Sequence, residues 1–360
     1  MQPMFNLQQV ELNPDSLTKT AYQLFQEAKN IFSVTHKTIS SNIGQLIVNT
    51  DKKATPLSTE TILKMRQRQQ DLIEIDWKEA KEGIYPESLL FDNPWDEFFR
   101  YYPSVWLDLP LIWQKVSQKA YQEFSPEINQ SGYPRYYLQN FHYQTNGYLS
   151  DESANLYDLQ VDLLFNGATD AMRRRVLKPL KQRLAGFDSP EYRILDVPCA
   201  TGRTLKMIRA AFPEAALFGV DLSPAYLRKA NQLLSESLGE LPQLIQANAE
   251  ELPYQDNYFH GLTNVFLFHE LPPETRQQVI AECYRVLQPG GVMVIADSIQ
   301  LEDHPEFTDM LNNFPITFHE PYYRSYISDN ITERLSLVGF ENIETQTHFA
   351  SKYWTASKPV

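Results

Sequence analysis

Apolar residues recur at helical spacing near the start of the chain. From Ser16 onward they fall three, four or seven positions apart, as on one face of a helix: Leu17, Leu24, Phe25, Ala28, Ile31 and Phe32. A second helix is expected to begin after Ser58, a good N-capping residue, and to run to about Glu82. Prolines and aromatic residues between Tyr85 and Pro110 favour short helices and turns. The pattern predicts a mainly helical N-terminal domain over residues 1–125.

Residues 126–170 interrupt this regular pattern. Up to Ser153 the segment is dense in aromatic residues, with glycine and proline among them, which favours irregular structure. A helical pattern returns from Ala154 to about Leu184. We interpret residues 126–170 as an aromatic-rich junction that acts as a lid.

Short apolar runs alternate with helical segments from Tyr192 to the end of the chain. This alternation is typical of parallel βαβ units. Strands are expected at 193–197, 216–220, 244–246, 261–266 and 292–296, helices at 205–212, from 223, at 273–287 and at 326–338, and an antiparallel hairpin at 342–349 and 351–357. The predicted fold class is α/β, with a doubly wound, mostly parallel seven-stranded sheet over residues 171–360.

Composition narrows the function classes. The net charge of −13 argues against a nucleic-acid partner, because neutralising phosphates requires a basic surface. Cys199 and Cys283 are the only cysteines, and their spacing fits no zinc motif, so we expect no metal site and a reducing, cytoplasmic location. We also expect no secretory signal and no membrane span. The oligomeric state stays open.

Four features follow one another in the α/β half. A strand ends in Asp196-Val197-Pro198-Cys199-Ala200-Thr201-Gly202 before a helix, a turn that aims backbone N–H groups at a ligand. The next strand ends at Asp221, where an acidic residue accepts hydrogen bonds from ribose hydroxyls. Asn248 and Ala249 follow the third strand, and a Pro289-Gly290-Gly291 turn leads into the fifth.

In this order and spacing the four features resemble the class I S-adenosylmethionine-dependent methyltransferases that act on small molecules. The resemblance covers about residues 171–360 and implies S-adenosylmethionine as the cofactor. It implies Asp196 and Gly202 near the methionine and adenosyl portions, Asp221 on the ribose, and Leu222, Asn248 and Ala249 around the adenine. Pro198, Ala200 and Val265 complete the implied set. Plain packing explains Leu222 and Ala249 equally well, and Asp221 also fits as a helix cap.

The loop after the first strand departs from the family pattern. Pro198 and Ala200 stand where two glycines are usual, and only Gly202 remains. Because proline and alanine disfavour left-handed backbone, we expect negative φ angles at both positions. Asn248 replaces a frequent aspartate, but its side-chain carbonyl still accepts a hydrogen bond.

Catalysis by this family requires chiefly alignment and exclusion of water, with a base where the acceptor must lose a proton. His269 is the candidate base because it follows the fourth strand, and Glu270 is its candidate partner. A helix-capping or structural histidine is an equally good interpretation.

Two aromatic segments are candidates for the acceptor pocket, although interdomain packing explains them as well. We expect a small aromatic or amphipathic acceptor to contact Tyr137, Phe141, His142, Tyr143, Phe318, His319 and Tyr322. Two other functions stay open. One is an NAD-dependent oxidoreductase, which the absence of Gly-x-Gly-x-x-Gly disfavours. The other is a catalytically inactive scaffold that binds the cofactor or a partner protein.

Overall fold

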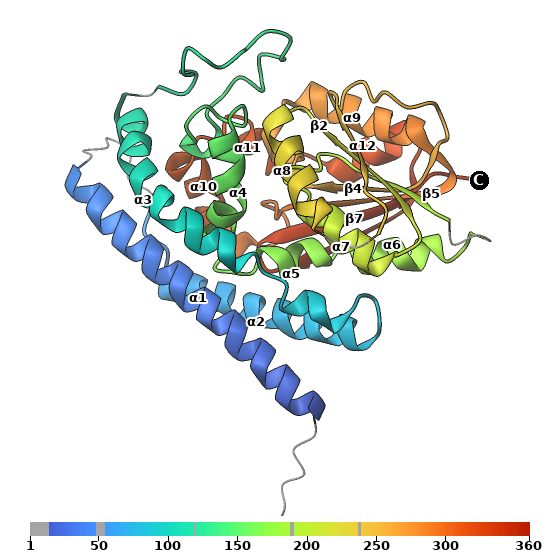
Figure 1. The fold of residues 1–360 in the computed structure, drawn as a ribbon, viewed down its shortest axis with the longest axis horizontal. Coiled ribbons are helices and arrows are strands. Elements are labelled where there is room, and N and C mark those ends of the chain that lie inside the picture. Colours follow the sequence, from blue (N-terminus) through green and yellow to red (C-terminus); the bar gives the residue numbers. More distant parts are fainter. Residues whose placement is uncertain (1–13, 48–54, 119, 188–190, 237–238) are drawn as a thin grey trace, which may run out of the picture.

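A seven-stranded sheet forms the centre of the molecule (Figure 1). The computed structural model describes residues 14–47, 55–118, 120–187, 191–236 and 239–360. The sheet order is β3-β2-β1-β4-β5-β7-β6, and β7 alone runs antiparallel to its neighbours β5 and β6. The strands are β1 (Arg193–Asp196), β2 (Ala216–Asp221), β3 (Gln243–Gln246), β4 (Phe259–Val265), β5 (Leu287–Ser298), β6 (Glu341–His348) and β7 (Ser351–Ser357). The predicted fold class is confirmed.

Helices cover both faces of the sheet because successive strand residues point to opposite faces. Ile194 packs on the face covered by α6 (Leu177–Leu184), α7 (Arg203–Ala211) and α8 (Pro224–Ser235), whereas Leu195 packs on the face covered by α9 (Pro273–Val286) and α12 (Ile331–Val338). The helix expected at 326–338 is divided in two: α11 (Tyr323–Tyr326) ends before Asn330, whose side chain caps α12. One further helix, α10 (Thr308–Thr317), follows β5.

The N-terminal region is helical, as predicted. It comprises α1 (Pro14–Ile47), α2 (Thr59–Lys81) and α3 (Trp95–Gln118), and Figure 1 shows α1 running beside α2 along one side of the molecule. The side chain of Ser58 accepts a hydrogen bond from the Thr61 amide, as expected of an N-cap. The boundaries predicted at 125 and 170 remain predictions.

The prediction of short helices and turns between Tyr85 and Pro110 is confirmed for its first part, which holds the short 3₁₀ helix η1 (Glu87–Leu90). It is wrong for the second part, because α3 continues through Pro103 and Pro110. Each proline removes one helical hydrogen bond. Tertiary packing offsets that loss: Val105, with Phe98, Tyr101 and Tyr102 beside it, packs at helical spacing on α4 (Asp151–Leu164). Packing outweighs local propensity in this helix.

The helical pattern expected from Ala154 to Leu184 is interrupted twice, at residues 165–168 and at residues 175–176. Between α4 and α5 (Thr169–Arg174) the chain turns at Asn166 and Gly167, which have φ angles of 54° and 81°. A β-carbon on Gly167 would lie 2.4 Å from the Lys29 β-carbon of α1. A glycine is therefore needed for both the left-handed turn and the close approach of α1.

A buried ion pair links the N-terminal helices to the α/β half. Asp76 of α2 accepts hydrogen bonds from Arg174 of α5 through Nε at 2.9 Å and Nη2 at 2.6 Å. The hydroxyl groups of Tyr22 and Tyr85 donate to the same carboxylate. Neither charged side chain is more than 1% exposed, so each depends on the other for solvation.

No helix in the described part of the chain combines the length and apolar composition that crossing a bilayer requires.

Candidate active site

The loop after β1 turns sharply into α7. The Cys199 amide donates to the Val220 carbonyl at 2.8 Å, and the Ala200 amide donates to the Asp221 carboxylate at 3.0 Å. Ala200 has a φ of 46°, so the expectation of a negative φ is wrong at this position. The hydrogen bond to Asp221 holds Ala200 in the left-handed region, which a glycine would adopt more easily. The Val197–Pro198 peptide bond is cis.

Gly202 stands at the start of α7 with a φ of 85°. A β-carbon here would lie 3.1 Å from that of Ala230 on α8. Gly202 therefore fixes the entry of α7 and its close packing on α8, beneath the loop rather than in the wall of the pocket.

Asp221 ends β2 and organises the backbone around it. Its two carboxylate oxygens accept hydrogen bonds from the amides of Ser223 (2.8 Å) and Ala200 (3.0 Å). Burial raises the pKa of Asp221 to about 6, although these backbone donors act in the opposite direction. Each oxygen has a further lone pair, so the group still accepts hydrogen bonds from a ligand.

Asp196 lies deeper, at the end of β1. Its Oδ1 accepts a hydrogen bond from the Thr263 hydroxyl at 2.6 Å, whereas Oδ2 has no partner among the described residues. Burial raises the pKa of this carboxyl to about 7. An unpartnered carboxylate oxygen in a fully buried position favours a polar or cationic ligand group nearby.

A small pocket of about 90 Å³ lies above these loops. Its wall includes seven of the nine expected cofactor residues: Pro198, Ala200, Asp221, Leu222, Asn248, Ala249 and Val265. Four tyrosines from the junction segment and α4 also line it: Tyr136, Tyr137, Tyr148 and Tyr157. Tyr136 donates hydrogen bonds toward Asn248 (3.4 Å) and Glu250 (2.5 Å), so the junction closes over the expected adenine side.

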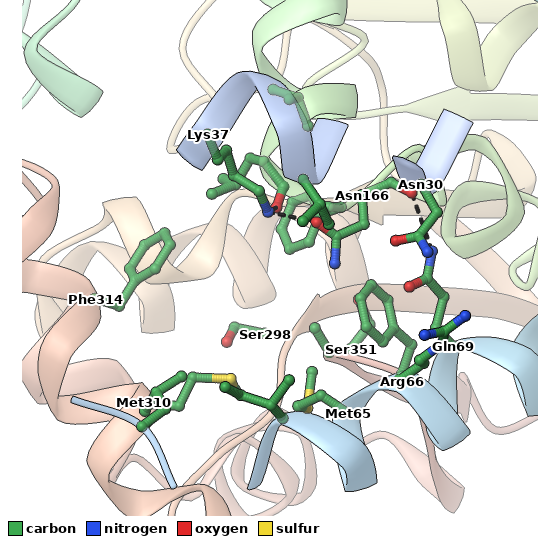
Figure 2. Close-up of a pocket in the computed structure, with 18 of the residues that line it drawn as sticks. Asn30, Lys37, Met65, Arg66, Gln69, Asn166, Ser298, Met310, Phe314 and Ser351 are labelled. Atoms are coloured by element: carbon green, nitrogen blue, oxygen red, sulfur yellow. Dashed lines mark hydrogen bonds between the residues drawn. The ribbon is translucent and has the colours of Figure 1, made fainter. Parts of the chain in front are cut away.

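A second cavity of about 1060 Å³ adjoins the small pocket. Figure 2 shows that α1, α2 and α10 contribute to its wall, with Lys37 and Asn166 on one side and Met310 and Phe314 on another. Most of the wall is apolar, including Ile31, Val34, Ile62, Met65, Val161, Leu164, Phe165, Phe266, Met310, Leu311 and Phe314. Tyr157, Phe266 and Glu270 line both spaces, so the two meet at these residues.

His269 faces the large cavity and is fixed by a carboxylate. Its Nδ1 lies 2.7 Å from Asp297 Oδ1, at the end of β5. Burial alone lowers the pKa of His269, but the charge and hydrogen bond of Asp297 outweigh it and raise the pKa to about 10. Sequence reasoning did not single out Asp297, although a polar residue at the carboxyl end of a parallel strand is the available signal.

Glu270 lies where the two spaces meet. Tyr148 donates a hydrogen bond to its Oε1, which lies 3.9 Å from His269 Nε2 and 3.8 Å from His142 Nε2. Burial raises the pKa of Glu270 to about 7, and the nearby charge of His269 opposes the increase. His142 lies more than a hundred residues before the adjacent His269 and Glu270, so the fold brings two distant segments together here.

Glu320 is a second buried carboxylate in this cluster, and sequence reasoning did not list it. Its Oε1 lies 3.2 Å from His142 Nε2, yet neither oxygen has a hydrogen-bond partner among the described residues. Burial, and then the charge of Glu270, raise the pKa of Glu320 well above its usual value.

The seven residues that the sequence predicted to contact the methyl acceptor fall into three groups in the structure. His142 lines the large cavity, and Tyr137 lines the small pocket. The remaining five pack around these spaces without appearing in either wall: Phe141, Tyr143, Phe318, His319 and Tyr322. For example, the rings of His319 and Tyr121 stack with centroids 4.3 Å apart, and that of Phe318 meets the edge of His142 at 5.8 Å.

Comparison with known proteins identifies the central part of the chain. The family model of a methyltransferase domain matches residues 194–291, so the family expected from the motifs is confirmed over this range. A demethylmenaquinone methyltransferase of Thermus thermophilus is 34% identical over 146 residues, which cover 41% of this chain and 62% of the relative. A carboxy-S-adenosyl-L-methionine synthase of Actinobacillus succinogenes is 28% identical, covering 39% of this chain and 56% of the relative.

Solved structures show a distant likeness. The phosphoethanolamine N-methyltransferase 2 of Haemonchus contortus, in complex with phosphomonomethylethanolamine and S-adenosylhomocysteine, is 15% identical, with a TM-score of 0.44. The match covers 59% of this chain and 61% of that one. The chain spans about three fifths of the length of these two curated relatives, and the N-terminal helices lie outside the family match.

Proposed function

We propose that this protein binds S-adenosylmethionine at the loops after β1, β2 and β3, and transfers its methyl group to a small, largely apolar acceptor in the large cavity. The observation that carries the proposal is the junction of the two spaces at Tyr157, Phe266 and Glu270. A methyl donor on one side and an acceptor on the other would meet there, as an in-line transfer requires.

The residues of the small pocket fit this cofactor in their chemistry. Asp221 retains acceptor capacity for the two ribose hydroxyls, and Asn248 and Glu250 offer polar groups beside the adenine position. Asp196 lines neither space, and we propose that its unpartnered Oδ2 interacts with the cationic amino group of the methionine portion through a bridging water molecule. The pocket is smaller than the roughly 300 Å³ of ordinary ligand sites. We therefore propose that Tyr136 and Tyr137 move when the cofactor binds, as lid residues.

The chain's own task in the reaction is alignment and removal of water. Bound S-adenosylmethionine supplies an electrophilic methyl carbon on a positively charged sulfur. Tyr157 and Phe266 would exclude water between the two ligands, and the apolar wall would hold the acceptor against the junction. The proton that a hydroxyl or acidic C–H of the acceptor loses would pass to the cluster at Glu270. His269 is less suited to accept it, because a pKa near 10 leaves it protonated at neutral pH.

The acceptor class follows from the shape and chemistry of the large cavity. Its volume accommodates a ligand larger than most cofactors, with an apolar body and one polar end at His142, His269 and Glu270. A hydroxylated aromatic ring with an apolar tail, such as a quinol, has this character. The name of the Thermus thermophilus relative, which refers to demethylmenaquinone, supports the same class.

The function is tested by cofactor binding and by turnover. The melting temperature of the purified protein is compared with S-adenosylmethionine, with S-adenosylhomocysteine and with NAD. Methyl transfer from labelled cofactor is then measured with a short-chain demethylmenaquinol as the acceptor probe. Stabilisation by NAD alone would favour an oxidoreductase, and no stabilisation by any of the three would favour a scaffold.

Glu270→Gln is expected to slow methyl transfer by about 10²–10⁴-fold, the usual contribution of acid–base groups. The amide keeps the size of the side chain and its contact with Tyr148, so the Kd for S-adenosylmethionine should stay within about threefold of the wild-type value. Single-turnover rates and calorimetric titration measure the two quantities. Glu251→Gln is the control. Glu251 is exposed and lines neither cavity, so this variant should retain full activity. A Glu270→Gln enzyme with the wild-type rate would remove Glu270 from the mechanism.

Val34→Trp is expected to raise the KM for the demethylmenaquinol probe by about tenfold or more, because the indole ring would occupy part of the cavity. Binding of S-adenosylmethionine should not change. Ile39→Trp is the matched control, since Ile39 is also an exposed apolar residue of α1 but does not line the cavity. Equal KM values for the two variants would show that the acceptor does not bind against α1.

A further inference from the structure

Three side chains that commonly bind metal ions converge where the two cavities meet. His142, His269 and Glu270 each place one possible ligand atom within 4.8 Å of those of the other two, and the contacts of Glu270 are with Nε2 of His142 and then Nε2 of His269. Glu270 Oε1 lies 3.8 Å from the first nitrogen and 3.9 Å from the second. A point equidistant from three atoms so placed lies no more than about 2.5 Å from each. Shifts of a few tenths of an ångström would reach the 2.0–2.2 Å of metal–nitrogen and metal–oxygen bonds.

The two imidazoles are prepared for coordination in different ways. Asp297 accepts the Nδ1 proton of His269 at 2.7 Å and so leaves Nε2 directed at the cluster, the arrangement found behind many metal-binding histidines. The Nε2 atom of His142 also faces the cluster, since it lies 3.8 Å from Glu270 Oε1 and 3.2 Å from Glu320 Oε1.

Glu320 gives an independent indication of a missing cation. Its side chain has no exposed surface, and both carboxylate oxygens lack hydrogen-bond partners among the described residues. Its Oε1 nevertheless lies 3.2 Å from His142 Nε2, so the group points into the cluster. A buried carboxylate without donors is costly, and a positive ion beside it would offset that cost.

We infer that His142, His269 and Glu270 bind a divalent first-row transition-metal ion, with the carboxylate of Glu320 beside it. Two imidazoles and a carboxylate suit Mn²⁺, Fe²⁺, Co²⁺ or Zn²⁺ and leave coordination positions open toward the large cavity. Binding of the ion would displace the proton that His269 carries at neutral pH. Glu270 and Glu320, both ionised, would balance the charge of the ion. His142 lies more than a hundred residues before the adjacent His269 and Glu270, so the three do not form a local motif, which is why the cysteine and histidine spacing indicated no metal.

This inference rests on the proposed function and assigns a role within it. A divalent ion at this place would draw electron density from a hydroxyl or enol oxygen of the acceptor and ease loss of its proton. The proton would pass to Glu320, and Glu270 would then serve as a ligand. The acceptor's electron pair forms the new bond to the methyl carbon while the carbon–sulfur bond breaks. No electrons are gained or lost by the ion.

The experiment measures metal binding by the full-length protein without any methyl acceptor. The chelator-treated protein is titrated with Co²⁺, and visible absorption, calorimetry and metal content after gel filtration are recorded. We expect one equivalent of tightly bound Co²⁺, a rise in Tm, and at least tenfold weaker binding in His142→Ala and Glu270→Gln. His304→Ala, which removes a histidine outside both cavities, should bind like the wild type. Glu320→Gln keeps the shape of a buried side chain and should also weaken binding if His142→Ala does not fold.

Two results would overturn the inference. One is a wild-type protein that retains no stoichiometric metal, and the other is equal Co²⁺ affinity in wild type, His142→Ala and Glu320→Gln. The proposed function is judged separately, by the Tm shift with S-adenosylmethionine and by methyl transfer in excess chelator. Full turnover in excess chelator would reject the role of the metal ion and leave the proposed methyltransferase function standing. Metal binding without any binding of S-adenosylmethionine would keep the metal site and reject the methyltransferase function.

Discussion

Asp221→Ala is expected to weaken binding of S-adenosylmethionine by at least about a hundredfold. The substitution removes the carboxylate proposed to accept hydrogen bonds from two ribose hydroxyls, and hydrogen bonds to charged groups contribute roughly 1.5–3 kcal/mol each. It also releases the Ala200 amide, which the carboxylate holds at 3.0 Å, so the loop after β1 loses a support. Every 1.4 kcal/mol corresponds to a tenfold change in Kd. Calorimetric titration with the cofactor measures the loss.

The same carboxylate predicts a pH dependence of cofactor binding. Burial raises the pKa of Asp221 to about 6, so the free protein carries a neutral carboxyl below that pH. A neutral carboxyl accepts fewer and weaker hydrogen bonds, and the Kd should therefore rise as the pH falls through about 6. Asp221→Ala should lack this dependence. Asp256→Ala, which breaks an exposed ion pair with Arg285, is the control and should behave like the wild type. An Asp221→Ala protein with unchanged affinity would reject the ribose assignment.

Asp76→Ala is expected to lower the free energy of unfolding by about 3–5 kcal/mol, the cost of leaving one partner of a buried ion pair alone. Arg174 would keep its charge in a position with 1% exposure, and the hydroxyl groups of Tyr22 and Tyr85 would lose an acceptor. Urea unfolding, followed by circular dichroism, gives the value. Because Asp76 lies outside both cavities, Kd values for the cofactor should be unchanged where the variant is folded.

Two comparisons make the Asp76 result specific. Asp71→Ala removes an exposed carboxylate from the same helix and should cost less than about 1 kcal/mol. Replacing both partners, with Asp76→Leu and Arg174→Met, should recover part of the loss, since an apolar pair needs no solvation. A loss below 1 kcal/mol in Asp76→Ala would mean that the N-terminal helices are held to the α/β half by other contacts.

The strands were predictable because their apolar runs are short and regularly separated by turns and helices. The same local reasoning failed at Pro103 and Pro110, where contacts with α4 maintain a helix that the prolines weaken. It also failed at Ala200, whose left-handed backbone is held by a hydrogen bond that its amide donates to Asp221 at the end of another strand. In each case the deciding interaction joins segments distant in the sequence.

The cofactor pocket and the polar cluster differ in how far the sequence could predict them, for the same reason. The expected cofactor residues lie in loops with a recognisable order, and seven of the nine line one pocket. The polar cluster brings together His142, His269, Glu270, Asp297 and Glu320 from separate segments, with no spacing to reveal it. Only His142, His269 and Glu270 were singled out, and the contribution of α1 to the cavity had no signal in the sequence.

Because α1 and α2 line only the large cavity, the two proposed ligands are bound by separate parts of the chain, which can vary independently during evolution. Ile31, Val34 and Met65 face the large cavity, whereas the loops after β1, β2 and β3 face the small pocket. Substitutions on these two helices therefore change the shape offered to one ligand without touching the groups that hold the other. A lineage can explore new acceptors by varying its N-terminal helices while its cofactor loops stay the same, and directed evolution of this protein can begin with the same few positions.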